Sequence, residues 1–347
     1  MTKTGGAGDR LRDLGEFGDN PGNLRGHIHV PDTVIDRPAL VVVLHGCTQT
    51  AASYDAGSGW SRLADRHGFV VLYPEQQRAN NPNLCFNWFQ PEDIGRGRGE
   101  AASIRAMIDT VAREYSVDPT RIFVTGLSAG GAMTSVMLAT YPELFAGGAI
   151  IAGLPYGSAT SVVQALDRMR GHGAADAMAL AASVRAASDH RGAWPSISVW
   201  HGSTDPTVHP SNAAATLAQW QTLHGVGDGA AETNVVDGFQ HRLWRDAADR
   251  PVIEEYRIAG MGHGTPLDAR GSEGSEVAGP HMLDMGISST RHIAAFWQLT
   301  DTPAAVRRPV VVTTATPHVA PEPARSPVQA GPAQVIEDAL RAAGLMR

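Results

Sequence analysis

The strongest constraint on the fold is a regular alternation of short apolar runs with longer helical patterns. The apolar runs are rich in β-branched residues and bounded by Gly or Pro; they occupy residues 39–46, 69–74, 121–126, 147–153 and 196–202. Runs of this kind are typical of strands buried on both faces of a sheet. Residues 24–31 and 251–260 indicate two further strands, the first at an antiparallel edge.

Helical patterns fill the intervals between these strands, at residues 60–67, 99–115, 129–141, 212–224 and 286–299. In the second of them Ile104, Ile108 and Val111 recur at helical spacing, so one face would pack on a sheet. The alternation predicts an α/β fold, with a mostly parallel, doubly wound sheet and helices on both faces.

Three regions are predicted along the chain: an N-terminal arm (1–22), the α/β domain (23–300) and a Pro/Ala-rich tail (301–347), in which residues 333–343 have the apolar spacing of a short helix. Residues 158–194 interrupt the alternation with an Ala-rich helical insertion. Such insertions commonly lie over the carboxyl ends of the strands, where ligands bind, although surface packing explains the segment equally well.

Composition argues against several other classes of protein. The formal net charge is −7 and no basic block is present, so no nucleic-acid partner is expected. No apolar run is long enough for a membrane span. The first residues lack the apolar segment of a secretory signal, so the chain as written is expected in the cytoplasm; a chain whose leader had been removed would be secreted. No pattern predicts an oligomeric state.

The metal-binding and thiol signals are weak. Cys47 and Cys85 are too few for a disulfide scaffold and too far apart for a zinc knuckle, and both buried thiols and a single disulfide are compatible with them. His27 and His29 alternate along a strand without further metal-ligand spacing. The glycines of residues 95–99 follow no strand and indicate a loop rather than a nucleotide site. We expect no metal and no cofactor.

The segment with the clearest chemistry is Gly-Leu-Ser-Ala-Gly at residues 126–130, between a predicted strand and a predicted helix. A strand that turns into a helix over so few residues needs crowded backbone angles, which flanking glycines allow, and it leaves the serine oxygen exposed. The G-x-S-x-G pattern alone is weak in a Gly-rich chain. Its position between strand and helix predicts Ser128 as a nucleophile.

A serine hydroxyl needs a base to take its proton, and the base needs a carboxylate to orient it. In this type of fold the acid and then the base follow the serine, each after a later strand. Asp205 and His263 occupy those positions and are the predicted acid and base. An Asx turn and a surface histidine are the plainer interpretations of the two residues. Less well placed alternatives are Asp189, Asp237, His241 and His281.

Charge that develops on an ester oxygen needs two N–H donors. Ala129, at the start of the helix, supplies one, and the loop after residues 39–46 supplies the other from the amide of Cys47 or of Thr48. Apolar residues in loops at the same end of the sheet are candidates for substrate contact, with core packing as the alternative. They are Tyr54, Phe86, Trp88, Phe89, Leu154 and Tyr156.

Four blocks resemble the polyhydroxybutyrate depolymerase family of α/β-hydrolase esterases, which is related to feruloyl and acetylxylan esterases. They contain LHGCTQTAASYDAG, DPTRIFVTGLSAGG, VWHGSTDPTVHPSN and GMGHGTPLD, and they span about residues 23–299. The resemblance implies Ser128 as nucleophile, Asp205 as acid, His263 as base and Cys47 in the oxyanion hole. It further implies hydrolysis of short-chain 3-hydroxyacid esters through an acyl-enzyme, without metal or cofactor.

The chain departs from the extracellular depolymerases of this type, which have a secretion signal and a separate polymer-binding domain. It resembles the catalytic part alone, and its tail has no aromatic residues to bind a polymer. We therefore expect oligomers and small acyl esters as substrates ahead of insoluble polymer. A carbohydrate esterase for feruloyl or acetyl groups is the alternative. A binding protein that retains a hydrolase shell is disfavoured by the complete set of catalytic residue types.

Overall fold

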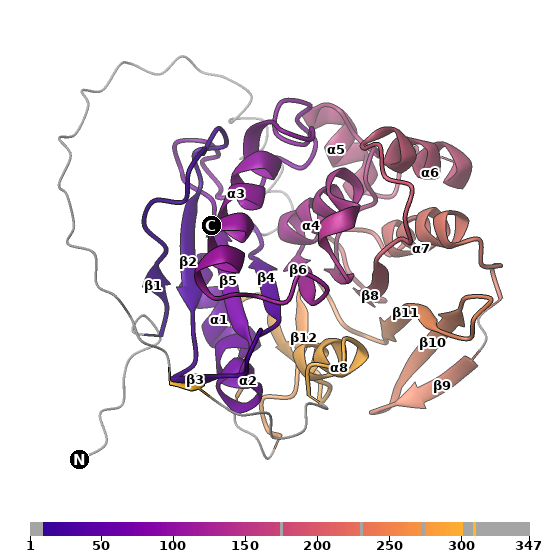
Figure 1. Cartoon of the computed structure of the whole chain (residues 1–347). Coiled ribbons are helices and arrows are strands. Elements are labelled where there is room, and N and C mark those ends of the chain that lie inside the picture. Colours follow the sequence, from indigo (N-terminus) through magenta and orange to yellow (C-terminus); the bar gives the residue numbers. More distant parts are fainter. Residues whose placement is uncertain (1–9, 174–175, 230–231, 272–274, 301–307, 310–347) are drawn as a thin grey trace.

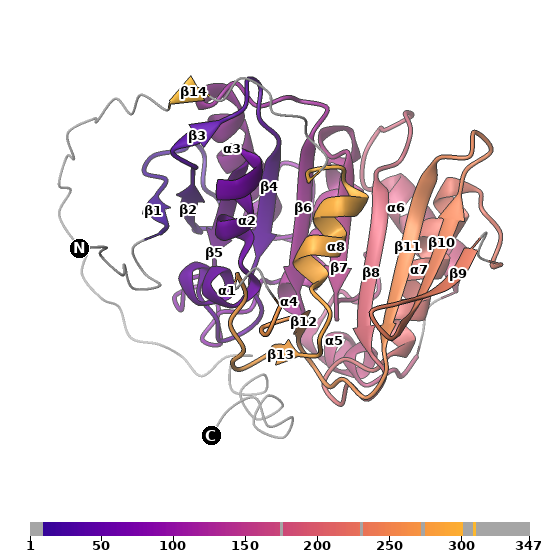
Figure 2. The same cartoon turned by 90° about the horizontal axis from the view of Figure 1, so that it is seen from below.

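A single ten-stranded sheet organises the computed structural model, which describes residues 10–173, 176–229, 232–271 and 275–300 and the backbone of 308–309. The strand order is β1-β2-β5-β4-β6-β7-β8-β11-β10-β9 (Figure 1; β7 is labelled in Figure 2). The central strands are parallel: β5 (Val70–Glu75), β4 (Leu40–Leu44), β6 (Ile122–Leu127), β7 (Gly147–Ile151), β8 (Ser196–Gly202) and β11 (Pro251–Ile258). The outer strands are antiparallel: β1 (Arg12–Asp13), β2 (Arg25–His29), β10 (Phe239–Arg245) and β9 (Glu232–Val236).

Helices cover both faces of this sheet (Figure 2). One face carries α3 (Gly99–Glu114), α4 (Ala129–Thr140), α5 (Val162–Met169), α6 (Ala177–Ala186) and α7 (Ser211–His224). The other carries α1 (Ala51–Ser58), α2 (Trp60–His67) and α8 (Ser289–Phe296). All of β4 is buried because its side chains alternate between two cores: Leu40, Val42 and Leu44 pack under the first group, and Val41 and Val43 under the second.

The predicted α/β-hydrolase fold is confirmed. The predicted strands form within a few residues of their expected bounds. Strand β2 is antiparallel as predicted, but the edge position expected for it is taken by β1. Helices α5 and α6 occupy the predicted insertion between β7 and β8. In the predicted N-terminal arm, β1 pairs with β2. The predicted helix at 333–343 lies outside the described residues.

Several elements are not among those predicted from the sequence, and α1, β9 and β10 are the longest of them. Helix α1 has no apolar stripe; it begins at a capping box in which the side chains of Thr50 and Ser53 bond each other's backbone. Strand β9 is almost wholly exposed, so it lacks an apolar alternation. The signal that could have found the β9–β10 hairpin is Asp237-Gly238, a dipeptide typical of tight hairpin turns, and both residues have positive φ, 48° and 87°.

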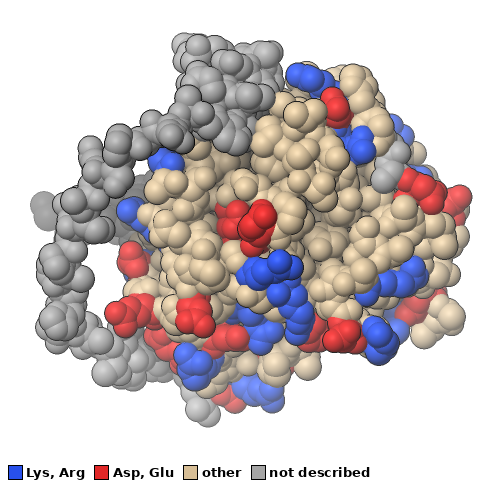
Figure 3. Space-filling view, turned by 90° about the horizontal axis from the view of Figure 1, so that it is seen from above, with Lys and Arg blue, Asp and Glu red and all other residues tan. Residues whose placement is uncertain are grey.

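On the face shown in Figure 3, basic and acidic side chains are intermixed rather than gathered by sign. Within the part of the chain that the structure describes, no helix has the length and apolar character needed to cross a membrane.

Candidate active site

Ser128 occupies the turn between β6 and α4, with φ 57° and ψ −117°. Two glycines make this turn possible. A Cβ at Gly126 would lie 2.5 Å from the Gly130 carbonyl carbon, and a Cβ at Gly130 would lie 2.3 Å from the Leu44 carbonyl oxygen. The Ser128 N–H donates to the Ile151 carbonyl at 2.9 Å, which fixes the turn at the carboxyl end of the sheet. This left-handed conformation is the crowded geometry that the glycine spacing predicts.

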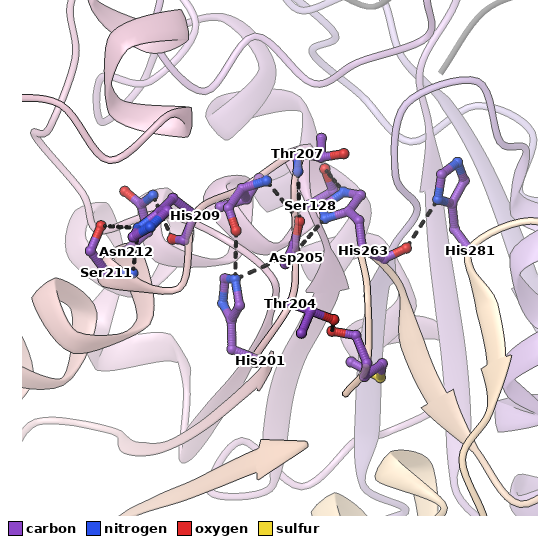
Figure 4. A network of polar contacts seen from close by, with 12 residues as sticks. Ser128, His201, Thr204, Asp205, Thr207, His209, Ser211, Asn212, His263 and His281 are labelled. Carbon is purple, nitrogen blue, oxygen red and sulfur yellow. Dashed lines mark hydrogen bonds and ion pairs between the residues drawn. The ribbon is translucent and has the colours of Figure 1, made fainter. Parts of the chain in front are cut away.

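His263 joins this serine to a buried carboxylate (Figure 4). Its Nε2 lies 2.9 Å from Ser128 Oγ, and its Nδ1 lies 2.7 Å from Asp205 Oδ2. The fold thus brings together the three residues predicted as nucleophile, base and acid, from loops that follow β6, β11 and β8. An alcohol, an imidazole and a carboxylate in this order can pass the proton of the alcohol to the ring.

The Asp205 side chain has no exposed area and receives hydrogen bonds on both oxygens. The N–H groups of Thr207 and Val208 donate to Oδ1, each at 2.9 Å. His201 Nε2 lies 3.4 Å from Oδ2 and 2.8 Å from the Val208 carbonyl oxygen. Burial alone would raise the pKa of Asp205, but the hydrogen bonds from His201 and His263 outweigh it and hold the pKa well below its ordinary value. Asp205 is therefore ionised at neutral pH.

His201 is a residue of the site that the sequence analysis missed. It is 4% exposed and lies at the end of β8, four positions before the carboxylate that it contacts. The loop that begins there also holds α5, because the His209 N–H donates to the Met169 carbonyl at 2.7 Å. The acid and the helical insertion are thus connected through one short segment of backbone.

The two predicted oxyanion donors lie beside the serine. Ala129 is the first residue of α4, so its N–H precedes the hydrogen bonds within the helix. In the other loop, the Thr48 N–H donates to the Asn83 carbonyl at 2.7 Å, which leaves the amide of Cys47 as the candidate. Cys47 and Ala129 line the same pocket as Ser128.

Cys47 and Cys85 form a disulfide, with their Cα atoms 4.2 Å apart. This settles the alternative that the sequence left open between free thiols and a single bond. The disulfide and the adjacent hydrogen bond between Thr48 and Asn83 join the loop after β4 to the loop after β5. The candidate oxyanion amide is therefore held by a covalent connection to the wall of the pocket.

An apolar pocket opens beside Ser128. Its lining comes from the loop after β5, the loop after β7, the loop after β8 and one face of α5: Asn81, Cys85, Trp88, Phe89, Leu154, Val162, Ala165, Leu166, Met169 and Val208. The α5 residues recur at i, i+3, i+4 and i+7, the spacing of a single helix face, and this pattern is the signal that could have identified them. Such a lining suits the hydrocarbon part of an acyl group.

Three of the six residues named for substrate contact line this pocket: Trp88, Phe89 and Leu154. The indole of Trp88 packs edge-on against the ring of Phe89, with centroids 5.3 Å apart. The aromatic wall expected from the sequence is present, but it is formed by Trp88 with Phe89.

The other three residues have different surroundings, which corrects the expectation. Tyr54 is 1% exposed and its hydroxyl bonds Thr265 Oγ1 at 3.1 Å, within the core beneath α1. Phe86 is fully buried and packs against the His45 ring, with centroids 5.0 Å apart. Tyr156 is half-buried against the same core as Phe86 and is not part of the pocket lining. Side-chain direction in irregular loops depends on these tertiary neighbours rather than on position in the sequence.

Of the alternative acids and bases, only His281 lies at the site, with its Nδ1 3.2 Å from the His263 carbonyl oxygen. Asp237 and His241 pair with residues elsewhere on the molecule, and Asp189 is exposed. Among the described residues, no group of three or more His, Cys, Asp or Glu side chains is arranged to hold a metal ion.

A doubly wound sheet with a serine on the turn from strand to helix, and with histidine and aspartate on later loops, defines the α/β-hydrolase class. Comparison with known proteins narrows this class. The family model described as Esterase PHB depolymerase matches residues 27–237. The chain belongs to this polyhydroxybutyrate (PHB) depolymerase family of esterases and is a carboxylic ester hydrolase.

Individual relatives include two kinds of esterase. The chain is 47% identical over 289 residues to poly(3-hydroxyalkanoate) depolymerase C of Paucimonas lemoignei, which covers 83% of this chain and 70% of that protein. It is 33% identical over 261 residues to acetylxylan esterase A of Aspergillus oryzae, covering 73% of this chain and 83% of that protein. The solved acetyl xylan esterase from Aspergillus awamori matches with a TM-score of 0.67 at 29% identity, covering 73% and 93% of the two chains.

A fully buried carboxyl supports the loop that forms the pocket wall. Glu100, in the first turn of α3, accepts a hydrogen bond from the Asn87 N–H at 2.8 Å and another from the side-chain amide of Gln76. The Gln76 N–H in turn donates to His45 Nε2 at 3.1 Å. Burial, with a smaller contribution from the charge of Asp93, raises the pKa of Glu100 to about 8.

We predict that Glu100 makes the protein less stable as the pH rises. Between its ordinary pKa of 4.5 and the folded value of about 8, the folded protein retains a proton that the unfolded chain has lost, so the free energy of unfolding falls across this window. Glu100→Gln, which has no titration, should flatten the dependence of the melting temperature on pH between about 5 and 8. Exposed Glu92→Gln is the matched control and should behave like the parent protein. Parallel melting curves for the parent and Glu100→Gln would contradict the assignment.

Proposed function

We propose that the chain hydrolyses esters through an acyl-enzyme on Ser128, with His263 as general base and Asp205 as the acid that orients it. The observation that carries this proposal is the pair of contacts at His263, 2.9 Å to Ser128 Oγ and 2.7 Å to Asp205 Oδ2. In this arrangement the carboxylate accepts a hydrogen bond from Nδ1–H, so that Nε2 has a lone pair to take the proton of the hydroxyl.

The reaction then has two halves. Ser128 Oγ attacks the ester carbonyl carbon while its proton moves to His263 Nε2, and the amides of Cys47 and Ala129 donate to the developing oxyanion. Collapse of the intermediate breaks the bond to the alcohol, which leaves with the proton held by His263. Water repeats these steps on the acyl-enzyme, releases the acid and restores the Ser128 hydroxyl.

The substrates that we propose are short-chain hydroxyalkanoate esters, such as polyhydroxybutyrate or its oligomers, and small acyl esters. The 47% identity to a poly(3-hydroxyalkanoate) depolymerase supports this class, and so does the apolar pocket beside Ser128. Acetyl or feruloyl esters of carbohydrate are the second candidate, favoured by the similarity to acetylxylan esterases. Side-by-side assays on hydroxybutyrate oligomers, acetylated xylan and ethyl ferulate would separate the two classes.

We further propose that the folded enzyme works in an oxidising compartment. The disulfide between Cys47 and Cys85 lies in the pocket wall, and structural disulfides persist in secreted and periplasmic proteins but are rare in the cytoplasm. This proposal runs against the sequence-based expectation for the chain as written. Free-thiol titration of the protein recovered from its native compartment would test it.

Ser128→Ala should reduce hydrolysis of p-nitrophenyl butyrate by at least about 10³-fold without changing the far-UV circular dichroism, because it removes the nucleophile alone. A fluorophosphonate probe should label the parent protein and not this variant, since only an activated serine reacts. Ser183→Ala, on the surface of α6, should retain both activity and labelling. Undiminished turnover in Ser128→Ala would refute the proposed mechanism.

Ala165→Leu should shorten the acyl pocket, because Ala165 is 3% exposed and lies on the α5 face that lines it. We expect the ratio of kcat/KM for p-nitrophenyl hexanoate to that for p-nitrophenyl acetate to fall about tenfold. This is the discrimination that results when an apolar pocket loses room for one or two methylene groups. Val163→Leu changes the outer face of the same helix, where Val163 is 66% exposed, and should leave the ratio unchanged. An unchanged ratio in Ala165→Leu would mean that the acyl chain binds elsewhere.

His201→Phe should move the acidic limb of the kcat/KM profile to higher pH. With one donor fewer, the Asp205 carboxylate keeps more of its negative charge on the oxygen that faces His263. This favours the protonated, inactive form of the His263 ring. His201→Gln retains an N–H donor and should keep the limb near its original position. If the rate falls in His201→Phe but the limb stays in place, His201 contributes packing only.

A further inference from the structure

Ser128 lies between two hollows of different composition. The apolar pocket has no contribution from His263, whereas a small second recess is lined by Gly46, Cys47, Gln49, Leu127, Ser128, His263 and His281. The departing alcohol must lie within hydrogen-bond reach of His263, and so must the attacking water. On the proposed acyl-enzyme mechanism, the second recess is therefore the side on which alcohol leaves and water enters.

The ring of His281 lines this recess, and only one of its two nitrogens makes a hydrogen bond within the described residues. Its Nδ1 lies 3.2 Å from the His263 carbonyl oxygen, and a carbonyl can only accept, so Nδ1 carries the hydrogen (Figure 4). In a neutral ring the other nitrogen, Nε2, then presents a lone pair. Nε2 has no hydrogen-bond partner among the residues that the structure describes. His281 thus offers an unused hydrogen-bond acceptor beside the base.

Burial keeps this ring neutral. It lowers the pKa of His281, and the neighbouring His263 acts in the same direction through its charge. The hydrogen bond to the His263 carbonyl and the more distant Asp205 carboxylate act the other way and are outweighed. The two imidazoles lie 5.8 Å apart between centroids, edge to face at 72°. One small molecule can contact both rings at this separation.

The backbone holds His281 in this position at a cost. His281 has φ 59°, the left-handed region that side chains other than glycine rarely adopt. Its carbonyl accepts a hydrogen bond from the Thr265 N–H at 2.8 Å, next to the pairing of β12 (Thr265–Leu267) with β13 (Met282–Asp284). A Cβ at Gly264 would lie 2.7 Å from that same oxygen, so the glycine after His263 permits the approach.

We propose that His281 accepts a hydrogen bond from the second O–H of the water that hydrolyses the acyl-enzyme. The water oxygen attacks the acyl carbonyl carbon, one of its protons passes to His263 Nε2, and its other O–H donates to His281 Nε2. When the intermediate collapses, the carbon–oxygen bond to Ser128 breaks, and Ser128 Oγ takes the proton from His263. The carboxylic acid leaves with the hydrogen that His281 had oriented. His281 is thereby a catalytic residue of the second half-reaction.

Competition between water and methanol for the acyl-enzyme isolates this role. Methanol gives its single hydroxyl hydrogen to His263 and has none left for His281. With p-nitrophenyl butyrate and added methanol, the ratio of methyl butyrate to butyrate should therefore rise about tenfold in His281→Asn, which is the order of one lost hydrogen bond. The ratio does not depend on which step limits turnover, because both products arise from one intermediate. Asparagine also tolerates the left-handed backbone, so the fold is retained.

Two further variants complete the test. His281→Gln reaches farther and has both a donor and an acceptor, so it should return the product ratio toward that of the parent. His172→Asn replaces an exposed histidine and should leave the ratio unchanged. An unchanged ratio in His281→Asn, whether the two products form at parental rates or are slowed equally, would overturn the role in water binding. Methyl butyrate formation that persists in Ser128→Ala would instead overturn the acyl-enzyme mechanism itself.

Discussion

The active-site geometry depends on one buried anion. The Asp205 carboxylate has no exposed area, and it stays ionised because two backbone amides and two imidazoles direct hydrogen toward it. A buried charge without such partners would be lost to protonation. Its ionisation fixes the tautomer of His263, which in turn determines whether Nε2 can accept the proton of Ser128. The loops at the ends of β8 and β11 therefore provide the hydrogen-bond donors that keep Asp205 ionised, in addition to the catalytic side chains themselves.

The opposite side of the serine is held by different means. A disulfide and the hydrogen bond between Thr48 and Asn83 hold the loop after β5 against the loop after β4, and the buried Glu100 carboxyl of α3 holds the loop after β5 from its other side. Donors in an oxyanion hole are effective when they are already in place before charge develops, since reorganisation then costs nothing. A covalent bond adjacent to the amide of Cys47, the candidate donor, restrains an otherwise irregular segment in this way. The Glu100 carboxyl that holds this loop is buried, and its pKa is raised as a result.

The sequence was sufficient to predict those parts of the fold and site that depend on a repeated pattern or on a backbone geometry that only glycine allows. Apolar runs predict the central strands because both faces of β4 to β8 are covered, and Gly126 and Gly130 predict the turn at Ser128 because only glycine fits there. Chain order then leads to Asp205 and His263. The positions of Tyr54 and Phe86 could not be predicted in the same way, because each side chain turns toward a core assembled from distant segments. Likewise, nothing in the sequence shows that His201 shares a carboxylate with His263.

The hydrogen bond between the His209 N–H and the Met169 carbonyl has a consequence for altering this enzyme. Helix α5 supplies one wall of the apolar pocket beside Ser128, and insertions of this type are the parts of a scaffold that vary most readily. Here α5 is attached to the segment that carries Asp205. Val208 lines the pocket, and its N–H also donates to the Asp205 carboxylate. Selectivity and turnover are therefore not independent traits in this scaffold. Grafting a foreign insertion to broaden the substrate range would require compensating changes in residues 205–209, chosen together with the graft.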